Sequence, residues 1–218
     1  MTLLELSNIS YIVKDKSIIR DVSLSVNQGD YITIVGPSGS GKSTLLKLCS
    51  DLISPSSGTI TYNGRPLTAI DPESYRKEVG YCFQRPYLFA KTVHRNILFP
   101  YDIRGLEPDM SRIEYLFDLL HMPLNYMERR NDELSGGEMQ RICLIRSLIF
   151  EPNVLLLDEV TSALDATNTS IVENVIDELY KKGITIISIT HNEEQSLRTA
   201  NRRITIVDGQ LAKEEVLR

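Results

Sequence analysis

A glycine-rich loop of fixed pattern constrains this chain more than any other feature of its sequence. Residues 36–44 read GPSGSGKST, which fits the pattern G-x-x-x-x-G-K-[ST]. A β-branched run at 31–35 precedes the loop, and an apolar helical pattern begins at Leu45. Between a strand and a helix, such a loop turns backbone N–H groups toward an anion at the positive end of the helix dipole. The sequence therefore predicts a phosphate-binding loop.

Two side chains of this loop carry the expected chemistry. Lys42 supplies a compact positive charge for the β- and γ-phosphates of a nucleotide, and the Ser43 hydroxyl is a ligand for Mg²⁺. We expect Lys42 to lie on a solvated loop, outside the core. A glycine-rich turn without a ligand is the alternative, but the pattern arises by chance in only about one per hundred chains of this length. The residues predicted to contact the nucleotide are Gly36, Pro37, Ser38, Gly39, Ser40, Gly41, Lys42, Ser43 and Thr44.

Three near-continuous apolar runs indicate the fold class. They lie at 31–35, 154–157 and 184–189 and are typical of strands buried on both faces of a parallel sheet. Helical patterns lie between them, so the chain reads as an α/β protein. We expect one domain over residues 1–218, since this length suits one large domain.

Two regions depart from this parallel core. In the N-terminal third, short strands at 3–6, 22–26 and 58–62 are separated by turn signals such as Asn63-Gly64, which predicts an antiparallel subsheet. Residues from about 86 to 150 carry helical patterns without a strong strand. We therefore expect a helical subdomain inserted in the α/β core.

Two carboxylates, Asp158 and Glu159, directly follow the apolar run at 154–157. Ligands of open α/β sheets sit at the carboxyl ends of the strands. There Asp158 can hold the hydrated Mg²⁺, and Glu159 can orient or deprotonate the attacking water. Many strand ends carry acidic residues, so the pair alone is weak evidence for a site. Its occurrence together with the phosphate loop is what supports a catalytic role.

His191 follows the third apolar run and is expected along the same sheet edge as Lys42 and Glu159. A lone histidine after a strand is usually a surface or capping residue. The shared edge favours a functional interpretation, in which a neutral imidazole donates a hydrogen bond to the γ-phosphate.

Residues 134–138 read LSGGE and open a helical pattern. Ser135 and Glu138 have the spacing of a capping box, so a well-made helix start is one interpretation. Gly136 and Gly137 each cost roughly 1 kcal/mol in a helix relative to alanine, which is unnecessary for a cap. We expect them to allow close approach of the backbone to another molecule, and a γ-phosphate is the expected ligand.

Together these residues resemble the ATP-binding-cassette (ABC) ATPase family. The loop at 36–44, LSGGE, the strand with Asp158 and Glu159, the segment 162–165 and His191 occur in the family's order. The resemblance implies a P-loop NTPase core that binds ATP and Mg²⁺ and hydrolyses ATP, with Asp165 at the nucleotide interface. Finer features resemble FetA-like ATPase subunits, which are implicated in iron export.

The resemblance assigns three further residues. Gln84 stands where family members have a glutamine that contacts Mg²⁺ or the attacking water and lies beside the membrane partner. Val13 stands where many members have an aromatic residue that stacks on adenine, and Tyr11 lies two residues earlier on the same strand face. Tyr11 either stacks on the base or packs in the core.

The resemblance also implies partners. In a head-to-tail homodimer, ATP lies between the loop of one chain and Ser135, Gly136 and Gly137 of the other. No apolar run reaches the ~18 residues of a membrane span, so we expect a separate transmembrane permease, with this chain at the cytoplasmic face of the cell membrane. Tyr87, Leu88, Phe89 and Phe99 are candidates for the docking surface or for core packing.

A soluble, non-transport ABC ATPase that acts on nucleic acid or as a regulator is the alternative function. The net charge of −5 argues against a nucleic-acid partner. Intact Lys42, Asp158, Glu159 and His191 argue against a regulator without turnover.

Overall fold

The structure is a computed structural model that describes residues 1–190 and 192–217. Its larger sheet has six strands in the order β10-β9-β3-β8-β7-β6, in which β10 is antiparallel to β9 and the remaining neighbours pair in parallel. The strands are β3 (Tyr31–Val35), β6 (Val79–Cys82), β7 (Val154–Asp158), β8 (Thr185–Ile189), β9 (Arg202–Val207) and β10 (Gln210–Val216).

Both faces of this sheet are buried, which explains the continuous apolar runs of its central strands. Every residue of β7 and β8 is buried. On β7, Leu155 and Leu157 join one hydrophobic core, while Val154 and Leu156 join a second core on the opposite face. Alternate residues of one strand thus serve different cores, which is why the run is apolar on both faces.

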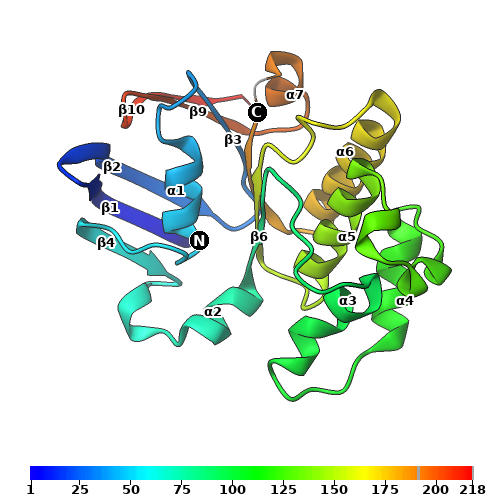
Figure 1. The fold of residues 1–218 in the computed structure, drawn as a ribbon. Coiled ribbons are helices and arrows are strands. Elements are labelled where there is room, and N and C mark those ends of the chain that lie inside the picture. The colour runs from blue at the N-terminus through cyan, green and yellow to red at the C-terminus, as the bar shows by residue number, and fades with distance from the viewer. Residues whose placement is uncertain (191, 218) are drawn as a thin grey trace.

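A second, antiparallel sheet lies beside the first, as the sequence predicts. Its strand order is β2-β1-β4-β5, and Figure 1 shows β1, β2 and β4 at one end of the molecule, with α1 between them and the centre of the view. The strands are β1 (Thr2–Val13), β2 (Lys16–Asn27), β4 (Ser57–Tyr62) and β5 (Arg65–Pro66). β1 and β2 are longer than the predicted segments because their pairing continues beyond a bulge. At this bulge the Asn8 side-chain amide donates a hydrogen bond to Asp21 Oδ1 (2.9 Å).

The chain between β6 and β7 forms helices, which lie together at the other end of the molecule (Figure 1). These are α3 (Val93–Asp102), α4 (Met110–Leu119) and α5 (Gly136–Leu148), with short 3-10 turns between them. The sheets are accompanied by α1 (Lys42–Cys49), α2 (Pro72–Glu78), α6 (Ala166–Lys181) and α7 (Glu193–Arg198). Within the described part of the chain, none of the helices is both long and apolar enough to cross a bilayer.

Candidate nucleotide site

The glycine-rich loop connects β3 to α1 and is held from behind by the turn between β9 and β10. The Gly209 N–H donates to the Ser40 carbonyl oxygen (3.0 Å). A Cβ atom at Gly209 would lie 2.3 Å from the carbonyl oxygen of Ile18 on β2, and one at Gly36 would lie 2.0 Å from that of Ile206 on β9. These two glycines are therefore required by close backbone packing around the loop.

Lys42, the first residue of α1, is buried, with 5% of its surface exposed. Its ammonium donates to the carbonyl oxygens of Gly36 and Pro37, each at 2.9 Å. Burial lowers the pKa of Lys42, while the nearby Glu159 and Asp158 act to raise it. The expectation of a solvated lysine is wrong, because the loop wraps around the side chain.

Asp158, at the end of β7, is buried and accepts a hydrogen bond on each carboxylate oxygen. Its Oδ1 accepts from the Ser43 hydroxyl (2.8 Å), and its Oδ2 accepts from the Tyr81 hydroxyl (2.9 Å). Burial, and secondly Asp158, raise the pKa of Tyr81, so its hydroxyl stays protonated and donates. The structure thus joins two of the three predicted metal ligands, Ser43 and Asp158, through a direct hydrogen bond.

Gln84 and Glu159 meet in the structure, although 75 residues separate them. The Gln84 amide nitrogen donates to Glu159 Oε2 at 2.6 Å. Glu159 follows β7 in a left-handed conformation (φ 49°), and its backbone N–H donates to the Ile189 carbonyl oxygen at the end of β8 (3.2 Å). This turn directs the carboxylate toward the loop.

Residues of the loop, Gln84 and Glu159 line one cavity of about 300 Å³. Its lining residues are Ile18, Ser38, Gly39, Gly41, Lys42, Ser43, Thr44, Gln84 and Glu159. The sequence-based reasoning missed Ile18 and, at the metal end of the site, Tyr81. No local sequence pattern indicates these two residues, because their places beside the loop and β7 depend on how the strands align in the fold.

Tyr11 and Val13 are not among the residues that line this cavity. Tyr11 is half-buried and packs against the core beneath β1 and β2, which is the structural alternative considered for it. Val13 is 42% exposed and pairs with Lys16 at the hairpin end. From this hairpin, Ile18 lines the cavity, and both Ile18 and Ile19 lie against Gly41 of the loop.

The LSGGE segment forms a capping box at the start of α5. Ser135 Oγ accepts from the Glu138 N–H (3.3 Å), and Glu138 Oε2 accepts from the Ser135 N–H (2.7 Å). A Cβ at Gly137 would come within 2.7 Å of the Asn168 side chain, whereas one at Gly136 would meet nothing within 4 Å. Gly137 is thus explained by packing inside the chain, and only Gly136 keeps open space in front of it.

Two predicted residues lie further along the chain. Asp165 caps α6, where its carboxylate accepts from the Asn168 N–H and from the Asn168 side-chain amide, both at 2.8 Å. The Asn168 hydrogen bonds hold the pKa of Asp165 below its ordinary value. His191 lies outside the described residues.

The site suits a magnesium nucleotide by the chemistry of its donors. Ser43 and Asp158 present hard oxygen ligands side by side, as Mg²⁺ prefers. Among the described residues, no side chain caps the N-terminus of α1, whose first residues Lys42, Ser43 and Thr44 line the cavity. Free polar groups around a buried lysine form a cradle for phosphate oxygens.

A phosphate loop after β3, together with a carboxylate at the end of β7 two strands away, defines a P-loop NTPase. Sequence comparison gives the family: a family model described as "ABC transporter" matches residues 19–162. The chain belongs to this family and is an ABC ATPase.

Solved structures agree with this assignment. The chain superposes with a TM-score of 0.89 on a dimeric post-hydrolysis state of the ATP-binding cassette MJ0796 bound to ADP and Pi, at 26% identity and with 99% of each chain covered. It also matches an ATP-bound bacterial Atm1-family ABC exporter at a TM-score of 0.86 and 26% identity, covering 99% of this chain and 39% of that one. These similarities confirm the expected α/β cassette fold.

Curated relatives differ in the solute that their names give. The probable iron export ATP-binding protein FetA of Escherichia coli K12 is 42% identical, covering 94% of this chain and 91% of its own. The lipoprotein-releasing system protein LolD of Leptospira interrogans is 36% identical, covering 90% and 85%. Both names describe the ATP-binding protein of a transport system.

Proposed function

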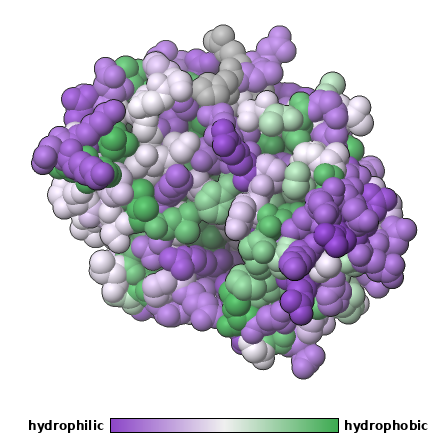
Figure 2. Space-filling view, in the orientation of Figure 1, coloured by the Kyte–Doolittle hydropathy of each residue, from purple (hydrophilic) through white to green (hydrophobic). Residues whose placement is uncertain are grey.

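We propose that this chain hydrolyses ATP as one half of a head-to-tail homodimer and powers a separate transmembrane permease from the cytoplasmic face of the membrane. The observation that carries this proposal is an apolar groove directly beside the nucleotide site. The groove has a volume of about 290 Å³ and lies between β6 and the helices α3 and α5. Figure 2 shows apolar residues gathered around this hollow.

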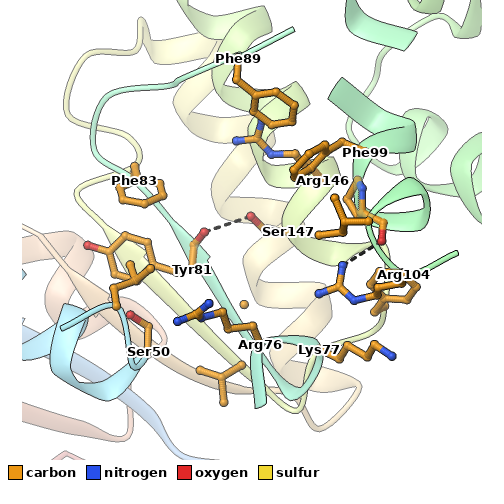
Figure 3. Close-up of a pocket in the computed structure, with 16 residues that line it drawn as sticks. Ser50, Arg76, Lys77, Tyr81, Phe83, Phe89, Phe99, Arg104, Arg146 and Ser147 are labelled. Carbon is orange, nitrogen blue, oxygen red and sulfur yellow. Dashed lines mark hydrogen bonds between the residues drawn. The ribbon is translucent and has the colours of Figure 1, made fainter. Parts of the chain in front are cut away.

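The lining of the groove suits a segment with apolar and acidic side chains. Phe83, Phe89 and Phe99 are each about two-fifths exposed at its wall, and the rings of Phe89 and Phe99 lie 4.3 Å apart. Every charged residue that lines it is basic, as Figure 3 illustrates; these are Arg76, Lys77, Arg104 and Arg146. We infer that a cytoplasmic loop of the permease with an aromatic or aliphatic anchor and a carboxylate docks here.

Of the four residues predicted for docking, two line the groove and two do not. Phe89 and Phe99 line it, whereas Leu88 packs against the helical core and Tyr87 is exposed outside it.

Within the nucleotide site, the chain's own residues have separate roles in this proposal. Lys42 and the backbone N–H groups of the loop bind the phosphates, and Ser43, Asp158 and Gln84 hold Mg²⁺. When bound, Mg²⁺ neutralises phosphate charge. Glu159, oriented by the Gln84 amide, takes a proton from the attacking water.

The other chain completes the site in this proposal. Ser135 and Gly136 are exposed and are not among the residues that line the cavity of their own loop, so they are available to a second copy. There the positive end of α5 faces the γ-phosphate across the dimer. Asp165 lies at the same interface, and His191 donates to the γ-phosphate.

For the solute, we propose iron efflux, supported by the 42% identical relative named for iron export. Other relatives are named for phosphate import and lipoprotein release, so the solute needs a test of its own. Deleting the gene is expected to increase sensitivity to iron or peroxide, with rescue by the wild type and none by Lys42→Ala. Unchanged tolerance across metals contradicts iron efflux and leaves the ATPase assignment intact.

Docking is tested by co-expressing the tagged chain with any multi-span membrane protein that a neighbouring reading frame encodes, and by recovering both in detergent. Phe99→Asp places a charge in the groove and is expected to abolish co-purification. Val216→Asp, at a more exposed apolar residue on β10 that lies outside the groove, is the control and is expected to have no effect. Retention of the membrane protein by Phe99→Asp contradicts the groove, and recovery of nucleic acid in its place supports the soluble alternative.

A further inference from the structure

Tyr81 belongs to the groove and to the nucleotide site at once. Its hydroxyl donates to Asp158 Oδ2 at 2.9 Å, while the residue also lines the groove. Its ring packs edge-on against Phe83, with the ring centroids 4.6 Å apart, and Figure 3 shows the two rings side by side at the wall of the groove. A single side chain therefore spans the distance between the groove and the metal-holding carboxylate.

The backbone of Tyr81 is fixed on both sides. On β6, it pairs in register with Leu156 of β7, two residues before Asp158. Its carbonyl oxygen accepts a hydrogen bond from the Ser147 hydroxyl on α5 (3.2 Å). With the backbone fixed, the freedom that remains to this residue is rotation of its ring between Phe83 and Asp158.

The hydroxyl of Tyr81 determines how Asp158 is oriented. Asp158 is 4% exposed, so its carboxylate depends on the two hydrogen bonds that it accepts, one from Ser43 and one from Tyr81. The Ser43 hydroxyl is itself a proposed metal ligand. The Tyr81 bond therefore fixes the carboxylate through a group that the metal does not use.

We propose that Tyr81 is a positioning residue that holds Asp158 for Mg²⁺ and transmits contacts at Phe83 in the groove to the metal site. The second half of this proposal rests on the groove being the docking site. A segment that presses on the Phe83 ring shifts the Tyr81 ring, and with it the hydroxyl that orients Asp158. The metal site thus responds to docking through one hydrogen bond, in addition to any movement of Gln84.

The test uses the purified full chain and compares its affinity for Mn²⁺·ADP with its affinity for ADP in EDTA, both by titration calorimetry. Tyr81→Phe keeps the ring and removes the hydroxyl. It is expected to weaken Mn²⁺·ADP binding about tenfold, as is typical when an outer-shell partner of a metal ligand is lost. Metal-free ADP binding is expected to change less than about twofold, because that binding uses the loop and not Asp158.

Tyr62→Phe is the matched control. It also removes a hydroxyl near a carboxylate, that of Glu78 (3.5 Å), but outside the residues that line the nucleotide cavity. Both affinities are expected to stay within about twofold of the wild type. An equal loss of both affinities in Tyr81→Phe means a general structural role and overturns the proposal, as does unchanged Mn²⁺·ADP binding.

Phe83→Ala tests the path from the groove without needing the membrane partner. It is expected to weaken Mn²⁺·ADP binding by a few fold in the wild type and to have no further effect in the Tyr81→Phe background. Additive losses mean that Phe83 acts by another route and overturn the transmission step. Because the measurement uses this chain alone, its outcome is independent of whether a permease co-purifies with Phe99→Asp.

Discussion

The side chains of Gln84 and Glu159 form a 2.6 Å hydrogen bond between the segments that follow two neighbouring strands, β6 and β7. Gln84 lies just after β6, the strand that borders the groove, and Glu159 is the proposed general base. Any movement of the segment after β6 thus changes the surroundings of the carboxylate.

Glu159→Gln is predicted to lower the ATPase rate by ~10²–10⁴, because the amide cannot take a proton from water. The loop, Ser43 and Asp158 do not depend on this carboxylate, so ATP binding is expected to persist. The variant is then expected to elute as an ATP-dependent dimer in gel filtration. Adding Ser135→Arg to this variant is expected to return it to monomer, because the arginine blocks the contact with the other chain. Glu128→Gln, at an exposed carboxylate, is the control.

Two other outcomes are informative. Hydrolysis at the wild-type rate means that Glu159 is not the base. If the variant is inactive, binds ATP and stays monomeric, Glu159 remains the proposed base. That outcome also means that closure of the dimer requires the membrane subunit.

Lys42→Ala is predicted to lower ATP turnover at least about 100-fold, as for loss of one preorganised group at a transition state. Because Lys42 also bonds the carbonyl oxygens of Gly36 and Pro37, we expect a lower free energy of unfolding as well, by about 1 kcal/mol. Phosphate release and denaturant unfolding measure the two effects. Lys47→Ala on the same helix is the control, and wild-type turnover in Lys42→Ala contradicts the assignment.

Substitution by alanine is predicted to change the stability of the chain at Gly137 but not to lower it at Gly136. Gly137→Ala forces the Asn168 side chain away from Asp165 and is expected to cost about 1 kcal/mol of stability, the value of one hydrogen bond. Gly136→Ala meets open space and is expected to leave stability unchanged or slightly higher. In an Asn168→Ala background the Gly137→Ala penalty should disappear; its persistence in thermal unfolding contradicts this packing explanation.

The stability of the chain is predicted to depend on Glu138 in acid. Burial acts to raise the pKa of Glu138, but hydrogen bonds from Tyr126 and the Ser135 N–H outweigh it and hold the pKa below the ordinary 4.5. Because the folded pKa is depressed, this stabilisation is present above about pH 4.5 and is lost as the pH falls through the folded value. Glu138→Gln can keep the capping hydrogen bond but removes the negative charge at the start of α5. It is expected to lower the free energy of unfolding by roughly 0.5 kcal/mol at pH 7 and to flatten its decline in acid. Equal slopes below pH 4.5 in both proteins would contradict this role.

Local pattern was sufficient for the elements that carry the site. The loop at 36–44, the strand before Asp158 and the capping box at Ser135 are each contained in one short segment, so spacing and burial pattern predict them. The loop and the carboxylates at the end of β7 meet at one sheet edge because parallel strands share their carboxyl ends, whereas the capping box at Ser135 does not line the cavity of its own chain.

Contacts between distant segments were not predictable in this way. Tyr81 reaches Asp158, and Ile18 reaches the loop, because of how strands align side by side, which no local pattern records. The burial of Lys42 follows from the curl of its own loop and was likewise missed. Tyr11 packs inward because β1 continues past its bulge as a strand with an apolar inner face.

The turn between β9 and β10 has a consequence for genetics. Gly209 supports the glycine-rich loop from behind, through its bond to the Ser40 carbonyl and its contact with Ile18. A screen for loss of ATP binding should therefore recover alleles at codon 209 alongside those in codons 36–44. Mapping such alleles by sequence position would place them far from codons 36–44, although the protein lesion is the same.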